Sequence, residues 1–141
     1  ALGAEYPLNP LKEDFADRVL EITNGMAADL FMEATGLPEK VYPGIERVIW
    51  EGRTLNSKVV VTARAEAKMP VQGEVLQVRR AQIIGAQGHS GHGTFPRVIE
   101  CMADGMDMTR MSTKKISLHE LPENILKLQT DRSEAKITYL A

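Results

Sequence analysis

The feature that most constrains the fold is a regular alternation of short apolar runs with segments of helical periodicity. The runs end in small residues and resemble buried strands, and between them apolar residues recur every three or four positions, as on one helix face. The predicted strands are 29–36, 57–64 and 81–88, and the predicted helices are 9–25, 38–52 and a short one in 73–80. Strands joined by helices are typical of βαβ units. We therefore predict an α/β fold with a mainly parallel sheet and flanking helices, and we expect Pro43 to delay or kink the first turn of its helix.

After Gly88 the pattern changes. The expected elements are a helix at 95–104, a strand at 112–118 with one face in water, a helix that opens at 118–123, and a closing strand at 136–140. These pieces are too few to form a core of their own. We therefore expect them to pack on something outside this chain.

Composition narrows the class of protein. The chain has 141 residues, the size of one domain, and 43% apolar with 26% charged residues is typical of a soluble globular protein. Apolar runs such as 59–61 are far too short to cross a bilayer, and a net charge of −2 gives no electrostatic reason to expect nucleic acid. We expect neither a membrane nor a nucleic-acid partner. The single cysteine, Cys101, and the lack of a secretory signal predict a reducing, cytoplasmic location.

Several catalytic motifs are missing from the sequence. It has no Gly-x-Ser-x-Gly elbow, no phosphate-binding Gly-x-x-x-x-Gly-Lys loop and no Gly-x-Gly-x-x-Gly turn. The last of these opens a dinucleotide-binding fold and brings pyrophosphate to a helix N-terminus. Either the fold is of another kind or its first half lies outside this chain. Because the first residue is Ala1 rather than Met, we expect a piece of a longer chain or a processed chain.

A glycine-rich stretch at 87–94 contains two of the three histidines, His89 and His92. A zinc site needs three or four ligands, and Cys101 and His119 are the only other soft ligands, so the metal interpretation is weak. The remaining interpretations are a flexible surface loop and a loop that lines a ligand. The residues alone leave these two open.

The ends of the predicted strands are the other candidate site. In an open parallel sheet, ligands bind beyond the carboxyl ends of the strands. Small residues stand there on two strands, at 35–36 and 62–63, and the stretch with His89 and His92 follows the third. Small residues let a flat ring or a ribose approach the backbone closely.

The order of these pieces resembles the second half of the medium-chain dehydrogenase/reductase family, the zinc-containing alcohol and polyol dehydrogenases. The similarity extends over essentially the whole chain. It is carried by the segments ALGAE, ITNGMAADLFMEATG, SKVVVTAR, AQIIGAQG and KKISLHELPENILKLQTDRSEAKITYL. Within the family, the run EVLQVRRAQIIGAQGHSGHGTFPRVIECMADGMDMT is most similar to the inositol-catabolic branch.

The resemblance implies a fold and a division of the chain. Residues 1–88 would be the C-terminal part of an NAD-binding Rossmann domain, and residues 89–141 a segment that returns to a GroES-like catalytic domain. The family's strand order implies a further strand at 6–8 that is separated from strand 29–36. Strand 29–36 would then lie at one edge of the sheet and strand 81–87 at the other. Family members dimerise through the latter edge, so we expect a homodimer or tetramer.

The resemblance also implies where the nicotinamide end of the cofactor binds. The glycine-rich turn, the zinc ligands and the other catalytic groups would lie in the earlier half, so no residue of this chain is expected to be catalytic or to bind metal. His89 and His92 would line the substrate. The residues implied to bind the cofactor are Thr35, Gly36, Val61, Thr62, Ala63, Ala86, Gly88 and Lys136.

The function implied is that of an NAD-dependent, zinc-assisted dehydrogenase that oxidises a secondary hydroxyl of a polyol or inosose. NADP is also possible as the cofactor, and this chain alone is expected to be inactive. Two other functions stay open: a freestanding nucleotide-binding module without redox chemistry, and a subunit that serves to assemble oligomers.

Overall fold

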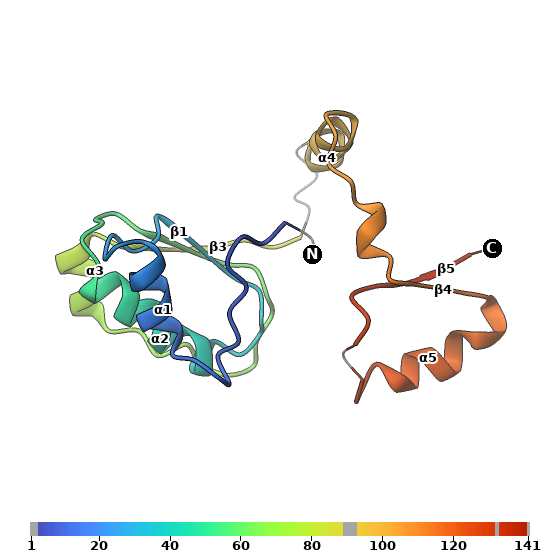
Figure 1. Cartoon of the computed structure of the whole chain (residues 1–141), viewed down its shortest axis with the longest axis horizontal. Helices are drawn as coiled ribbons and strands as arrows, with labels where there is room; N and C mark the ends of the chain where they lie inside the picture. The colour runs from blue at the N-terminus through green and yellow to red at the C-terminus, as the bar shows by residue number, and fades with distance from the viewer. Residues whose placement is uncertain (1–2, 89–92, 132, 141) are drawn as a thin grey trace. The chain divides into compact units, whose positions relative to one another are not determined.

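The computed structural model describes residues 3–88, 93–131 and 133–140, and these residues form two compact units (Figure 1). The described residues of the first unit run from Ala4 to Gly88. Those of the second run from Gly93 to Leu140 and include Gly3.

The first unit is built on a three-stranded parallel sheet. Its strands are β1 (Leu30–Glu33), β2 (Lys58–Val61) and β3 (Gln82–Gly85), in the order β1-β2-β3. Glu33 pairs with Val61, and Val61 pairs with Gly85, so the three strands end in register. The predicted α/β fold with parallel strands is confirmed, and β1 and β3 are the two edges of this sheet, as expected.

Three helices accompany the sheet. They are α1 (Phe15–Ile22), α2 (Pro38–Glu51) and α3 (Gly73–Arg79), and α2 packs against both of the others (Figure 1). The Asp14 side chain caps α1 by accepting a hydrogen bond from the Asp17 N–H at 2.9 Å. The prediction that Pro43 would delay α2 is wrong, because the helix begins at Pro38 and includes Pro43. Proline at the start suits the helix, since the first N–H groups have no intrahelical partner.

The core lies between the helices and one face of the sheet. In β1, Phe31 and Glu33 are buried, whereas Leu30 and Met32, which alternate with them, are 55% and 59% exposed. The opposite face of this edge strand is therefore open, as the side-chain period of two requires. The buried apolar cluster consists of Ala16, Ala27, Phe31, Tyr42, Ile45, Val48, Ile49, Val59 and Val75.

A charged cluster links α1 to α2. Arg47 of α2 donates to Glu51 on its own helix at 2.9 Å and to Asp14 before α1 at 3.0 Å, and it also pairs with Asp17. These contacts bring together side chains about thirty positions apart in sequence. Because these side chains are exposed to solvent, the ion pairs contribute little to the stability of the fold.

The predicted strand at 6–8 is not present. Residues 4–9 contain bends and irregular backbone and pair with no strand of the described sheet. A strand needs a partner for its backbone N–H and C=O groups. None of the described residues offers one at this position.

The second unit has few buried residues. It contains α4 (Thr94–Ala103), η1 (Thr109–Met111), β4 (Lys114–Ile116), η2 (Leu118–Glu120), α5 (Leu121–Lys127) and β5 (Ile137–Tyr139). β4 and β5 form a parallel pair. Of the described residues in this unit, only Ile116 and Asn124 are buried, which agrees with the expectation that these elements lack a core of their own.

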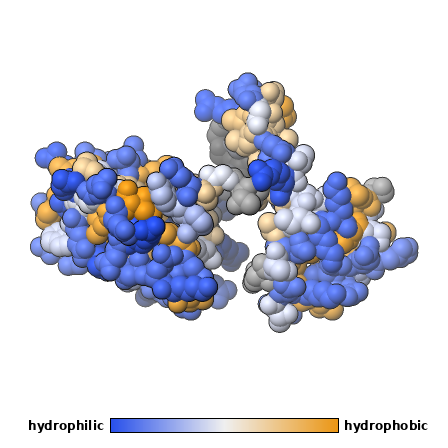
Figure 2. All heavy atoms as spheres, in the orientation of Figure 1, coloured by the Kyte–Doolittle hydropathy of each residue, from blue (hydrophilic) through white to orange (hydrophobic). Residues whose placement is uncertain are grey.

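The helix α4 leaves its apolar side chains uncovered. None of its residues is buried, and Phe95 and Ile99 are 63% and 64% exposed. Apolar residues are visible over this helix in the space-filling view (Figure 2). None of the helices in the described parts of the chain has the length and apolar character needed to span a membrane.

Tyr42 provides a test of core packing. Its side chain is 0% exposed, and its hydroxyl has no hydrogen-bond partner among the described residues. Burial, followed by the nearby charge of Glu46, raises the pKa of Tyr42 to about 12. Tyr42→Phe removes an unpaired buried hydroxyl, so we expect the free energy of unfolding to stay the same or to rise by up to about 1 kcal/mol. Urea unfolding would measure this, and a loss above about 1 kcal/mol would mean that the hydroxyl has a partner.

Candidate functional site

The three parallel strands bring the predicted site residues to one edge of the sheet. Hydrogen bonds hold the strand ends together: Ala86 N–H donates to Val61 C=O at 2.9 Å, and Thr62 N–H donates to Glu33 C=O at 2.9 Å. The structure thus places Thr35, Gly36, Val61, Thr62, Ala63 and Ala86 along the carboxyl ends of neighbouring strands. In open parallel sheets this edge is where ligands bind.

The end of β1 is a tight turn built on the side chain of Glu33. One carboxylate oxygen, Oε1, accepts hydrogen bonds from the Thr35 hydroxyl at 2.5 Å, the Thr35 N–H at 2.8 Å and the Gly36 N–H at 3.2 Å. The Thr35 hydroxyl in turn accepts from the Leu37 N–H at 3.0 Å, next to the start of α2. A carboxylate near a helix N-terminus interacts favourably with the helix dipole.

Gly36 allows two strand ends to approach each other closely. Its φ is +72°, in the left-handed region that favours glycine. A Cβ atom at this position would lie 3.1 Å from the Arg64 carbonyl oxygen and 3.9 Å from the Ala63 Cβ. Any larger residue would both strain the backbone and press on the chain that follows β2.

The main chain of Glu33 joins the turn to the end of β2. Its carbonyl oxygen accepts from the Thr62 hydroxyl at 2.9 Å, in addition to the Thr62 N–H, and from the Ala63 N–H at 3.3 Å. Glu33 therefore contacts four of the predicted site residues, two through its side chain and two through its backbone.

Glu33 itself was missed by the sequence analysis. It is 1% exposed, and its second oxygen, Oε2, is buried without a hydrogen-bond partner among the described residues. The hydrogen bond from the Thr35 hydroxyl, ahead of those from the two N–H groups, holds the pKa of Glu33 below its ordinary value of 4.5 although burial acts the other way. The signal available in the sequence was a charged residue inside the apolar run DLFMEATG.

The structure does not place the other predicted residues at this cluster. Gly88 lies past the end of β3, exposed and with a φ of +43°. Lys136 belongs to the second unit, where its carbonyl accepts a hydrogen bond from the Thr113 N–H at 3.0 Å and its side chain is exposed. His89 and His92 lie outside the described residues.

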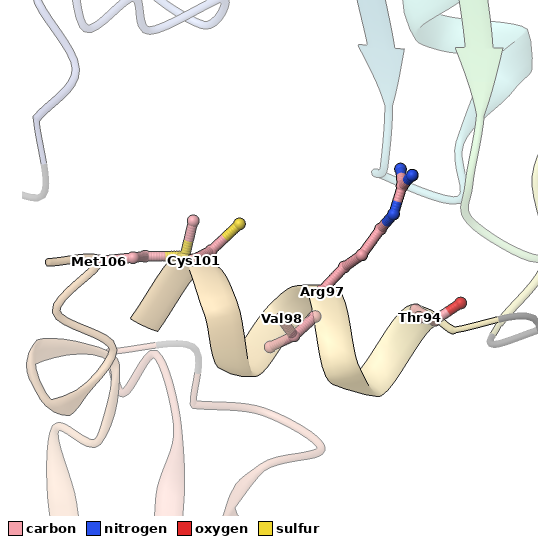
Figure 3. Close-up of a pocket in the computed structure, with 5 residues that line it drawn as sticks. All are labelled: Thr94, Arg97, Val98, Cys101 and Met106. Atoms are coloured by element: carbon pink, nitrogen blue, oxygen red, sulfur yellow. The ribbon is translucent and has the colours of Figure 1, made fainter. Parts of the chain in front are cut away.

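The second unit has an open hollow on α4. It is lined by Thr94, Arg97, Val98, Cys101 and Met106, and the sticks in Figure 3 show these side chains along the helix and just beyond it. The cysteine is free and exposed. Neither this hollow nor any other described part of the chain groups three His, Cys, Asp or Glu residues that could hold a metal ion.

The chain is similar to alcohol dehydrogenases in both sequence and fold. No protein-family model matches it. Its relatives and structural neighbours include a zinc-type alcohol dehydrogenase-like protein from Haemophilus influenzae, 26% identical, and a 2R,3R-butanediol dehydrogenase from Bacillus subtilis, 25% identical with a TM-score of 0.76. The chain matches the C-terminal part of the alcohol dehydrogenase structures. The family resemblance inferred from the sequence motifs is confirmed.

A sequence relative and a solved structure, both from Thermotoga maritima, are particularly similar to this chain. Scyllo-inosose 3-dehydrogenase is 58% identical over 139 residues, which are 99% of this chain and 35% of that protein. A solved structure assigned as an alcohol dehydrogenase from the same organism is 57% identical, with a TM-score of 0.94 over 99% of this chain and 35% of the other. The chain thus spans about a third of the length of these relatives.

A more distant neighbour shares the fold alone. It is an alcohol dehydrogenase from Escherichia coli that was solved with NADH, and it is 14% identical with a TM-score of 0.76. The match covers 94% of this chain and 37% of that structure.

Proposed function

We propose that the chain forms the C-terminal part of an NAD-dependent dehydrogenase that oxidises a secondary hydroxyl of a polyol or inosose. The observation that carries this proposal is the 58% identity with scyllo-inosose 3-dehydrogenase over 99% of the chain. The match extends over 99% of the chain, so the matched region includes the strand ends at which the cofactor would bind. The proposal extends to a cytoplasmic location and to a homo-oligomer formed through the free edge of β3.

The carboxyl edge of the sheet would hold the nicotinamide half of the cofactor. Thr35, Gly36, Thr62 and Ala63 place small side chains there, and their N–H groups donate to Glu33. A Cβ atom at Gly36 would lie 3.1 Å from the Arg64 carbonyl oxygen. When bound, the nicotinamide supplies the acceptor for a hydride from the substrate. Val61, Ala86 and Gly88 would complete this wall, and Lys136 would lie near the pyrophosphate. The role of these residues is to bind and orient the ring.

Unlike the nicotinamide cofactor, zinc is not expected to bind to residues of this chain. The described residues offer no set of three ligands, so they do not fit a zinc site. We propose that zinc, if the enzyme uses it, is held by residues outside this chain. No part of the proposed role of this chain depends on the metal.

The experiment that tests the proposed function is a binding titration on the purified protein after its intact mass has been measured under denaturing conditions. NADH fluorescence would follow binding, and oxidation of scyllo-inosose and related polyols would be assayed by the appearance of NADH. We expect binding and turnover by a protein well above 15.6 kDa. A protein that binds neither NADH nor NADPH at millimolar concentration would contradict the proposal and favour a module that assembles oligomers.

His92 provides a test of the substrate side. We expect His92→Ala in the complete enzyme to raise KM for the polyol or lower kcat, by about tenfold in kcat/KM, while the Kd for NADH stays within twofold. The reason is that a site for several hydroxyls needs several polar partners, and one lost hydrogen bond costs about this much. His119→Ala, at an exposed position of η2, is the matched control and should change neither constant. Unchanged steady-state constants in His92→Ala would remove this histidine from the substrate site.

A further inference from the structure

The carboxylate of Glu33 is a buried charge without a counter-ion. It is 1% exposed, and no Lys, Arg or His within the described ranges forms an ion pair with it. Its Oε1 is satisfied by three hydrogen bonds, but its Oε2 has no partner among those residues. By contrast, the carboxylates that do form ion pairs among the described residues are exposed to solvent.

The three hydrogen bonds to Oε1 favour the charged carboxylate and offset part of its lost hydration, but Oε2 has no such partner among the described residues. A buried carboxylate loses its hydration, and buried charges in proteins are ordinarily paired or coordinate a metal. Glutamine would fit the same space, could accept the same three hydrogen bonds and would carry no charge. The site thus departs from the rule that a buried charge is paired, and departures of this kind are expected at functional positions.

The position of the charge indicates which cation compensates for it. Oε1 lies within 3.2 Å of the Thr35 and Gly36 nitrogen atoms, and the backbone of Glu33 bonds to Thr62 and Ala63. These are the residues that, under the proposed function, face the nicotinamide ring. That ring carries a positive charge in the oxidised cofactor and none in the reduced cofactor. Two charges several ångströms apart still interact at the effective dielectric constant of a protein, so direct contact is not required.

We propose that Glu33 favours binding of the oxidised, cationic nicotinamide cofactor over the reduced, neutral one. This inference rests on the proposed function, because it requires the nicotinamide to bind at this edge of the sheet. Glu33 is then a residue that sets the relative affinity for the two forms of the cofactor, and it does so through its charge and through the turn that it holds.

The test is Glu33→Gln in the complete enzyme, with NAD+ and NADH as probes. Isothermal titration would give both Kd values, and we expect the Kd for NAD+ to rise about tenfold while that for NADH changes less than twofold. Glu51→Gln, at the opposite end of α2 from the turn, removes the same charge from a partly exposed position and should change neither value. Thermal unfolding of Glu33→Gln should stay close to that of the wild type.

Each outcome decides the matter. If Glu33→Gln weakens NAD+ and NADH by the same factor, Glu33 has only a structural role, and the inference is wrong while the proposed function stands. If Glu33→Gln does not fold, Glu33→Asp replaces it. This variant keeps the charge, so the Kd for NADH divided by the Kd for NAD+ should equal the wild-type value. A tenfold fall in this ratio would overturn the inference. A wild-type enzyme that binds neither cofactor form would overturn both proposals.

Discussion

Gly52→Ala is expected to lower the free energy of unfolding by about 3 kcal/mol or more. A Cβ atom at this position would lie 2.3 Å from the Ala27 Cβ, 2.8 Å from the Val48 carbonyl oxygen and 3.2 Å from the Met26 carbonyl oxygen. Two of these three atoms belong to the backbone and cannot move by a change of side-chain rotamer, so the backbone itself must shift. Overpacking of this kind costs about 1–3 kcal/mol and sometimes more.

The effect of Gly52→Ala comes from packing and not from backbone conformation, because φ of Gly52 is −71°, which alanine adopts readily. Urea unfolding followed by circular dichroism would measure the loss. Gly73→Ala is the matched control, since a Cβ there meets nothing within 4 Å. The control should be neutral or more stable by about 0.5 kcal/mol. A Gly52→Ala variant as stable as the control would show that the Gly52 and Ala27 segments can move apart at little cost.

Ile49→Ala is expected to destabilise the first unit by about 3–4 kcal/mol. Ile49 is 0% exposed and belongs to the apolar cluster in which α2 packs on β1 and β2. Removing three buried carbon atoms loses their transfer free energy and leaves a cavity, and such changes cost about 2–5 kcal/mol. The same denaturation experiment would measure the change.

A graded series makes this second prediction specific. Ile49→Val should cost about 0.5–1.5 kcal/mol, because it removes one carbon atom. Lys40→Ala, at an exposed position of the same helix, should stay within about 0.5 kcal/mol of the wild type. If Ile49→Ala costs no more than Ile49→Val, the cluster closes around the cavity and is packed less tightly than its burial indicates.

Local patterns in the sequence determined most of the secondary structure. The helix predicted at 38–52 is α2 at Pro38–Glu51, and the three apolar runs contain β1, β2 and β3. These elements could be predicted because a helix and a buried strand each impose a period on the side chains, and neighbouring residues carry that period. The parallel sheet followed because strands joined by helices run in the same direction.

The strand predicted at 6–8 is absent because a strand depends on a partner elsewhere in the chain, and not on a local period. This strand was implied by the family resemblance and not by a local pattern, and a strand exists only where another strand accepts and donates its backbone hydrogen bonds. The described sheet has its edge at β1, and residues 4–9 do not pair with it. Local sequence carries no information on whether such a partner is present.

The candidate site divides in the same way. The sequence by itself determined that small residues follow two of the strands and a glycine-rich stretch the third, and parallel strand direction placed the ends of these strands at one edge. Only the tertiary structure decided that Glu33 is buried beneath them and bonds to Thr35, Gly36 and Thr62, and that Gly52 lies against Ala27. The hydrogen bonds from Thr35 and Gly36 to Glu33 are local, but the burial of Glu33 and its contact with Thr62, 29 positions away, are not. A periodic pattern reports only on the few residues of one helix or strand, so it carries no information on such distant contacts.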